Sequence, residues 1–293
     1  MGSGGESGRH NGGLRGSRMR GYFEVEPGVR LHYAVDDFTD PWEPAETIVM
    51  LHGFAESLEA WRAWVPHLSR RYRLVRVDLR GFGKSTPMAE DYEWPADRLL
   101  ADIEVLAEHL GLSRFHLLGA KSGGSWALQF ALAHPEKVIS VLGMTPPVVG
   151  APAMPEWRRM IQAEGVVPWA HATMVARLGS GAGATELKWW AENVQGRTPV
   201  STMLGYLAQV QSLDLRREVL KIRCPTLIVT TTGSGLRTVE SVREWQSQMQ
   251  DSELVVIEGD AWHAAAAYPD RCAEETLAFL TQVAAGARVD RSS

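Results

Sequence analysis

The sequence has few cysteines, no long apolar run and little net charge. Its 293 residues include only two cysteines, Cys224 and Cys272, which excludes a disulfide framework and favours a reducing, cytoplasmic compartment. No apolar stretch approaches the roughly 20 residues that a membrane helix needs. A net charge of −5 argues against nucleic acid or an anionic membrane as the main partner. We therefore expect a small-molecule substrate, and the sequence leaves a homodimer open.

Cofactor motifs are also missing. No metal-ligand spacing connects the histidines His52, His116, His134, His171 and His263. Gly83-Lys84-Ser85 is not a phosphate-binding loop, because that motif requires glycine where Asp78 stands, and no dinucleotide fingerprint is visible. We expect no cofactor and no metal. Residues 1–20 are rich in Gly, Ser and Arg without an apolar core, which predicts a flexible tail and not a signal peptide.

Short apolar runs alternate with helical patterns along most of the chain. Strands are predicted at residues 22–25, 29–35, 47–51, 74–77, 115–118, 138–144, 225–230 and 253–257, the first two as an antiparallel pair. Helices are predicted at residues 58–71, 95–110, 126–132 and 238–249, and after His263. This alternation of buried strands with helices predicts an α/β fold with a mostly parallel, doubly wound sheet.

The rhythm changes between residues 147 and 213. This segment contains no strand-like run, and its helical patterns include Trp157, Trp169, Trp189 and Trp190. It is predicted to be a helical cap inserted between two parts of an α/β core, residues 21–146 and 214–284, with a tail at 285–293. The tryptophans are compatible either with an aromatic-lined pocket or with ordinary core packing.

Three motifs occur in a fixed order. Residues 51–57 read LHGFAES, residues 78–85 read DLRGFGKS, and residues 119–124 read GAKSGG between an apolar run and a helical pattern. The third has the form of a nucleophile elbow, G-x-S-x-G, with lysine in the middle. Together the motifs resemble the α/β-hydrolase fold superfamily, in particular its epoxide hydrolase and dehalogenase subgroup, over about residues 20–284. The resemblance implies the fold and implies much less about the chemistry.

The resemblance places Lys121 at the nucleophile position. In the family the nucleophile precedes a Gly-Gly pair by two residues and a His-Pro pair by about fourteen, and both spacings point to Lys121. A shift of register by one residue would instead place Ser122 there, and this alternative stays open.

The other two catalytic positions also differ from the family pattern. The loop that normally carries the acid reads Thr-Thr-Gly-Ser-Gly-Leu at residues 231–236, and the alternative acid position holds Thr145. The histidine position falls on Trp262, with His263 one residue later. Asp260 is expected either to orient His263 or to cap the next helix. No intact Ser-His-Asp triad can be assembled, so ester hydrolysis by that route is not expected.

A lysine at the elbow suggests amine chemistry. Burial and the positive end of the following helix both lower a lysine pKa, by up to about 3–5 units when burial is complete. A neutral Lys121 amine would be a nucleophile or a base, and the backbone N–H groups of Phe54 and Ser122 would form an oxyanion hole. We therefore expect Schiff-base or general-base catalysis of the lyase, isomerase or cyclase type on a small, largely apolar carbonyl compound.

The predicted catalytic residues are Lys121, His263 and Ser122, and the predicted substrate-binding residues are His52, Phe54, Glu56, Trp262, Thr145, Trp157 and Tyr206. Among these, His52, His263 and Tyr206 are candidate proton carriers, and Glu56 has a structural role as its alternative. Two other functions remain open. One is a binding protein whose protonated Lys121 pairs with a ligand carboxylate or phosphate. The other is a hydrolase that uses Ser122 or a water activated by His263.

Overall fold

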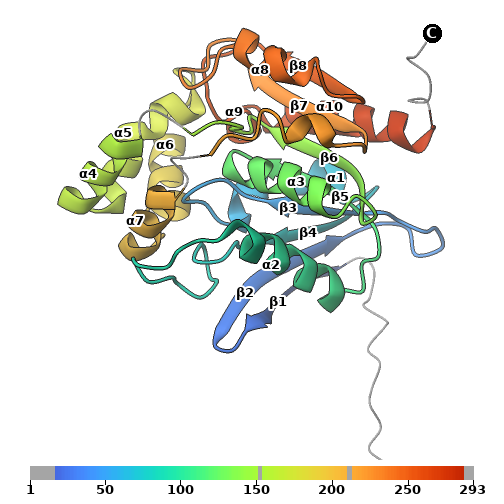
Figure 1. Ribbon diagram of the computed structural model, residues 1–293, viewed down its shortest axis with the longest axis horizontal. Helices are drawn as coiled ribbons and strands as arrows, with labels where there is room; N and C mark the ends of the chain where they lie inside the picture. The colour runs from blue at the N-terminus through green and yellow to red at the C-terminus, as the bar shows by residue number, and fades with distance from the viewer. Residues whose placement is uncertain (1–16, 151–153, 210–212, 287–293) are drawn as a thin grey trace, which may run out of the picture.

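The core of the protein is an eight-stranded sheet with the order β1-β2-β4-β3-β5-β6-β7-β8 (Figure 1). This computed structural model describes residues 17–150, 154–209 and 213–286. The strands are β1 (Ser17–Glu26), β2 (Val29–Asp37), β3 (Thr47–Leu51), β4 (Arg73–Val77), β5 (Phe115–Ala120), β6 (Val138–Met144), β7 (Thr226–Thr231) and β8 (Ser252–Ile257). β2 runs antiparallel to β1 and to β4, and the other neighbouring strands are parallel. The predicted fold class is confirmed.

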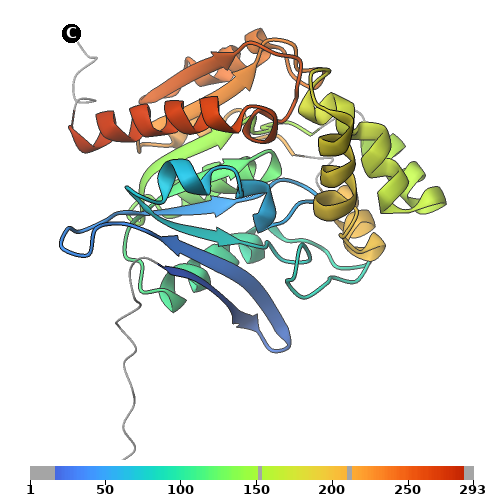
Figure 2. The same ribbon diagram turned by 180° about the vertical axis from the view of Figure 1, so that it is seen from behind.

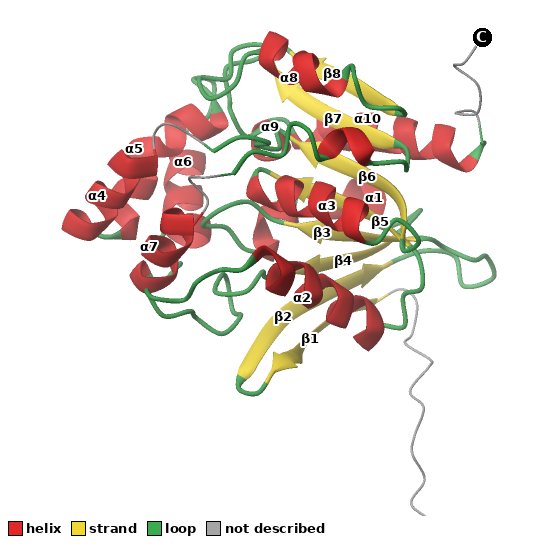
Figure 3. Ribbon diagram, viewed as in Figure 1, coloured by secondary structure: helices red, strands yellow, loops and turns green. Residues whose placement is uncertain are grey.

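Helices cover both faces of the sheet, as the helix and strand colouring of Figure 3 shows. One face packs against α2 (Ala96–His109), α3 (Ser122–Ala133) and α8 (Val239–Gln246). The other face packs against α1 (Val65–Leu68), α9 (Ala264–Ala267) and α10 (Pro269–Ala284), and α10 is the long red helix in front of the sheet in Figure 2. The central strands β3, β5 and β7 are buried along their whole length because both of their faces are covered.

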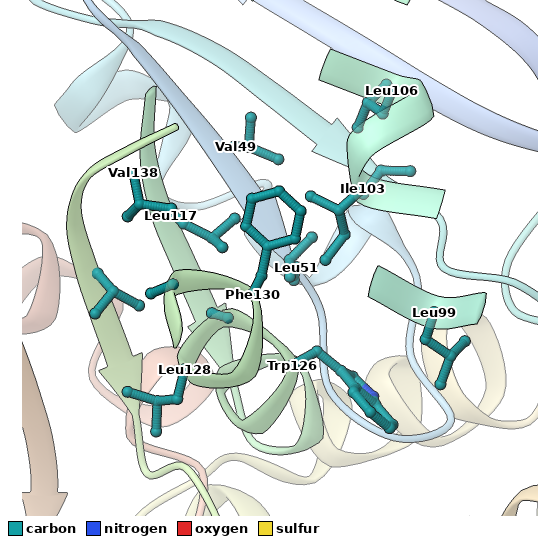
Figure 4. Close-up of a cluster of buried hydrophobic side chains, with 14 of the residues drawn as sticks. Val49, Leu51, Leu99, Ile103, Leu106, Leu117, Trp126, Leu128, Phe130 and Val138 are labelled. Carbon is teal, nitrogen blue, oxygen red and sulfur yellow. The ribbon is translucent and has the colours of Figure 1, made fainter. Parts of the chain in front are cut away.

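The core between α2, α3 and the sheet fixes the position of the β5–α3 turn. Phe130 of α3 packs among Val49 and Leu117 of the strands and Ile103 of α2 (Figure 4). Full burial of side chains of this size contributes about 1.5–3 kcal/mol each to stability. The turn that precedes α3 is therefore held on a rigid layer of the molecule.

The predicted helix at residues 58–71 is wrong in its continuity. The structure has a 3₁₀ helix at Leu58–Trp61 and the separate short helix α1. Pro66 lies in the first turn of α1 and has no backbone N–H, so one continuous helix cannot pass through this position. The strand β1 begins at Ser17, so residues 17–20 belong to the sheet and not to the predicted tail. The rest of that tail, residues 1–16, and residues 287–293 of the predicted C-terminal tail lie outside the described residues.

Between β6 and β7 the chain forms a separate group of helices, at the left of Figure 1. They are α4 (Met154–Glu164), α5 (Val166–Leu178), α6 (Ala184–Trp190) with a π-helical turn at Ala191–Gln195, and α7 (Val200–Gln209). Gly165 and Gly179 flank α5 with φ angles of 88° and 87°, which only glycine adopts without strain. These inserted helices have a hydrophobic cluster of their own that includes Trp169, Met174 and Leu207.

In the part of the chain that the structure describes, no helix has both the length and the apolar character needed to cross a bilayer.

Candidate active site

Lys121 lies at a sharp turn between β5 and α3. Its backbone has φ 52° and ψ −127°, a conformation that costs a non-glycine residue about 1–3 kcal/mol and that clusters at functional sites. Two neighbouring glycines make the turn possible. A Cβ atom on Gly119 would lie 2.3 Å from the Gly123 carbonyl oxygen, and one on Gly123 would lie 2.3 Å from the carbonyl oxygens of Leu51 and His52. The turn therefore points one side chain, that of Lys121, away from the sheet.

The Lys121 side chain enters a cavity between the sheet and the inserted helices. The cavity contains about 1020 Å³ of empty space, including its opening. Within the cavity the Lys121 amine donates a hydrogen bond of 3.0 Å to the backbone carbonyl of Trp262. Among the described residues that line the cavity there is no Asp or Glu, whereas three cations, Lys121, Arg177 and Arg237, do line it.

The surroundings of Lys121 favour the neutral amine. Burial is the main cause, and the positive charges of Arg177 and Arg237 add to it, so that the pKa of Lys121 falls from 10.5 to about 7. The charge of Glu56 acts in the opposite direction but does not cancel these effects. A substantial fraction of Lys121 is therefore deprotonated near neutral pH.

Seven of the ten residues predicted for the site line this cavity. They are Lys121, Ser122, Phe54, Thr145, Trp157, Tyr206 and Trp262. The aromatic members contact one another: the Phe54 and Tyr206 rings stack at 5.2 Å, and Trp157 packs edge-on against Trp262 at 5.6 Å. The cavity wall is therefore largely aromatic, although Trp169 and Trp190 of the inserted helices pack in their cluster and do not line it.

Tyr206 connects the cavity wall to the turn. Its hydroxyl accepts a hydrogen bond of 3.1 Å from the Trp126 indole N–H, and it is also hydrogen-bonded to the Ser122 side chain. Burial raises the pKa of Tyr206 above its ordinary value, so the phenol stays protonated. A neutral hydroxyl therefore lies next to the residue that follows Lys121.

The other three predicted residues, His52, Glu56 and His263, are not among those that line the cavity. His52 accepts a hydrogen bond of 3.0 Å from the Leu79 N–H through Nε2, which leaves Nδ1 as the donor to the Gly53 carbonyl at 2.8 Å. Burial lowers the pKa of His52. Because both ring nitrogens are occupied, His52 holds two loops together.

Glu56, which belongs to the loop at residues 52–57, forms a buried contact with His263. Glu56 Oε1 lies 2.7 Å from His263 Nε2, and Oε2 accepts a hydrogen bond of 2.9 Å from the Gly53 N–H. Burial alone would raise the pKa of Glu56, but the charge and hydrogen bond of His263 lower it to about 2. The predicted histidine of the site thus pairs with a carboxylate on the Phe54 loop.

The loops expected to carry the family acid bring no carboxylate to Lys121. Thr145 and Thr230 line the cavity instead, and Thr231 donates a hydrogen bond of 2.6 Å to the Ala261 carbonyl. Asp260 is exposed and accepts hydrogen bonds of 3.1 Å from the Ser180 N–H. It does not orient His263.

The sequence prediction missed Arg177, Arg237 and Trp126, all of which line the cavity. Arg177 had a detectable signal, because it is the single Asp, Glu, Lys or Arg in the 13-residue helix α5. A lone charge on an otherwise apolar helix indicates either a buried pair or a site, but the sequence does not say which partner it meets.

The sheet order, the turn at Lys121 and the helices inserted before β7 define the class of the protein. A sequence model of the alpha/beta hydrolase fold matches residues 46–267, and the chain belongs to this family.

Its relatives within the family carry several different names. Epoxide hydrolase 3 of Xenopus tropicalis is 36% identical over 131 residues, which is 44% of this chain and only 34% of the relative's length. A pimeloyl-[acyl-carrier protein] methyl ester esterase of Aeromonas hydrophila is 27% identical over 72% of this chain and 86% of its own length. Among solved structures, the enol-lactonase from Burkholderia xenovorans LB400 superposes with a TM-score of 0.80 and 22% identity, covering 89% of this chain and all of the other. These matches agree on the fold and not on one reaction.

Proposed function

We propose that this chain is an atypical enzyme of the α/β-hydrolase fold that acts on a carbonyl compound through the amine of Lys121. In this proposal Lys121 replaces the family nucleophile, and the reaction is of the lyase, isomerase or cyclase type. One observation carries the proposal: a lysine with a pKa near 7 lies at the nucleophile turn, inside a cavity without a carboxylate. Depressed lysine pKa values are typical of amines that attack carbonyl groups.

The first step is the formation of an imine. The lone pair of Lys121 Nζ attacks the carbonyl carbon, and the electrons of the C=O double bond move to oxygen. The backbone N–H groups of Phe54 and Ser122 stabilise that oxyanion. After proton transfer from nitrogen to oxygen, one water molecule leaves and a C=N bond remains. Protonation of this imine makes it an electron acceptor, so that a neighbouring C–H or C–C bond is weakened.

Tyr206 is the proposed proton carrier. Of the three candidates, His52 is hydrogen-bonded to Gly53 and Leu79, and His263 contacts Glu56. Tyr206, in contrast, lines the cavity and is hydrogen-bonded to Ser122. A protonated phenol donates to the departing oxygen and takes a proton back later in the cycle.

Reductive trapping tests this proposal. The protein is incubated at pH 8 with 4-phenyl-2-butanone, a neutral methyl ketone, and treated with sodium borohydride, which converts an imine into a stable secondary amine. We expect peptide mapping to locate the added mass on Lys121. The matched control is Lys121→Arg, because arginine keeps a cation at the turn and forms no imine under these conditions. Equal modification of Lys121 and the exposed Lys84, or equal modification of wild type and K121R, would contradict the proposal.

Hydrolysis through Ser122 is the second candidate function. It is supported by the names of the relatives, by the presence of Ser122 in the cavity wall, and by the hydrogen bond between Ser122 and Tyr206. Labelling by a serine-directed phosphonate located to Ser122, together with absence of the Lys121 adduct, would favour this function. Saturable ligand binding with neither adduct would favour a binding protein.

A further inference from the structure

The second cation of the cavity, Arg177, is buried and has no hydrogen-bonded carboxylate among the described residues. Its exposure is only 3%, yet Nη2 has no hydrogen-bond acceptor among the described residues. Its Nε donates a hydrogen bond of 3.3 Å to the Thr173 hydroxyl, which carries no charge. Arg177 lines the same cavity as Lys121. A buried charge without a counterion costs several kcal/mol, so its presence calls for a functional reason.

Aromatic rings surround this guanidinium. Its central carbon lies 4.8 Å from the ring centre of Trp169, 5.3 Å from that of Trp262 and 5.6 Å from that of Trp157. Cation–π contacts stabilise a desolvated arginine by about 2 kcal/mol or more, but they accept none of its N–H groups. The indole N–H groups of Trp169 and Trp262 likewise have no acceptor among the described residues. The cluster therefore offers several donors and lacks an acceptor.

No other part of the described site supplies that acceptor. The nearby Glu56 is already bound to His263 and to the Gly53 N–H. The third cation, Arg237, differs from Arg177, because it donates to the backbone carbonyls of Leu236, Val149 and Gly150. Arg237 holds its own loops together, and Arg177 is the cation left for a ligand.

We infer that Arg177 binds the carboxylate of the substrate, so that the substrate is an oxo acid with its carbonyl group at Lys121. The part of this inference that concerns the carbonyl rests on the proposed function. A carboxylate is a pure acceptor, and its two oxygens match the planar fork of one guanidinium. The aromatic walls then enclose the apolar chain that joins the two groups.

The residues proposed to bind the carbonyl group and the carboxylate both lie next to the indole ring of Trp262. The Lys121 amine lies 5.7 Å from the ring centre of Trp262, and the Arg177 guanidinium lies 5.3 Å from the same centre. A bound carboxylate would offset the positive charge of Arg177. It would therefore favour the positively charged, protonated imine at Lys121 over the neutral amine. Substrate binding and activation of the imine would be coupled in this way.

The test compares matched acids and esters. 4-Oxopentanoate and 6-oxoheptanoate each carry a methyl ketone and a carboxylate, and their methyl esters keep the ketone but lose the charge. Borohydride trapping on Lys121 is measured against probe concentration. For the better of the two acids we expect half-saturation at a concentration at least tenfold lower than for its ester. Arg177→Met should remove this preference and still trap the ester. Equal half-saturation by acid and ester in the wild type would overturn the inference.

A second measurement separates this inference from the proposed function. Hexanoate has no carbonyl group for Lys121 to attack, and its binding is followed as a rise in the thermal midpoint. We expect the same rise in wild type and in Lys121→Met, and its loss in Arg177→Met. The matched control is Arg159→Met, which removes an exposed arginine of α4 that does not line the cavity and should leave the rise unchanged. Absence of a Lys121 adduct together with this pattern would overturn only the imine chemistry. A hexanoate effect that persists in R177M would overturn the carboxylate site.

Discussion

Buried arginines occur in two regions of this protein, and the two regions treat them differently. In and just after β4, Arg76 donates at 2.8 Å to Asp36, and Arg80 contacts Asp102 at 2.7 Å and is also paired with Glu26. In the cavity, Arg177 is also buried, and its side-chain contacts among the described residues are with aromatic rings and a hydroxyl and not with a carboxylate. The two arginines near β4 are therefore neutralised by carboxylates of the protein, whereas Arg177 is left to be neutralised by a ligand.

The two environments also shift pKa values in opposite directions. Burial alone would lower the pKa of Arg80, but its hydrogen bonds with Asp102 and Glu26 raise it above the ordinary value. Burial lowers the pKa of Arg177 to about 10, because Glu56 compensates only in part. The comparison shows that burial does not by itself define a functional cation. What distinguishes Arg177 is burial without a bound carboxylate.

The largest expected difference is between the free energies of unfolding of an Arg80 variant and an Arg177 variant. Arg80→Met leaves Asp102 buried without its partner and is expected to lower the free energy of unfolding by about 3–5 kcal/mol. Arg177→Met removes an uncompensated charge and leaves an apolar side chain of similar length, so its free energy of unfolding should change by less than about 1 kcal/mol or increase. Urea unfolding of both variants measures the difference. Similar losses in both would mean that Arg177 has a structural partner after all.

The lysine of the cavity should make stability depend on pH. The unfolded chain binds the Lys121 proton below about pH 10.5 and the folded chain only below about pH 7. Between these values the unfolded state holds more protons, so the free energy of unfolding rises with pH, by up to about 1.4 kcal/mol per pH unit. Lys121→Met should lack this increment. Urea unfolding of wild type and K121M from pH 6 to pH 10 measures this increment as the difference between their free energies of unfolding. A difference that does not change with pH would show that the pKa of Lys121 is not lowered in the folded protein.

The smallest change in the free energy of unfolding should come from Arg98, an exposed member of the ion-pair network around Arg80. Arg98 lies 3.2 Å from Glu26, in the same network as Arg80, but 46% of its side chain is exposed. Exposed ion pairs contribute about 0–1 kcal/mol, so Arg98→Met should change the free energy of unfolding by no more than that. A loss as large as that of R80M would show that the network depends on all of its members and not on burial.

Much of the site could be predicted because its central residue lies in a local motif. Gly119, Lys121 and Gly123 belong to one strand-turn-helix segment, and the close contact that requires glycine at position 119 is with Gly123 of the same segment. Phe54 and Tyr206 also line the cavity, as expected from the resemblance and from the helical pattern. The helix predicted at residues 58–71 failed because the helical periodicity was given more weight than Pro66.

The electrostatic character of the cavity could not be predicted in the same way. The pairing of His263 with Glu56 and the position of Arg177 depend on contacts between segments that are far apart in the sequence. A histidine or an arginine has the same sequence signal whether a carboxylate faces it or not. The expectation of a largely apolar substrate rested on the tryptophans alone, and the folded cavity adds two further cations to Lys121.

The backbone connects the inserted helices directly to the loop that holds Lys121. The N–H of Trp262 donates to the carbonyl of Ala176 at 3.1 Å, the N–H of His263 donates to that of Arg177 at 3.1 Å, and the Trp262 carbonyl accepts from Lys121. The inserted segment is therefore not an interchangeable module. A chimaera that receives the corresponding segment of another family member would lose the anchor of this loop along with Arg177, and the two halves of the cavity would have to be redesigned together.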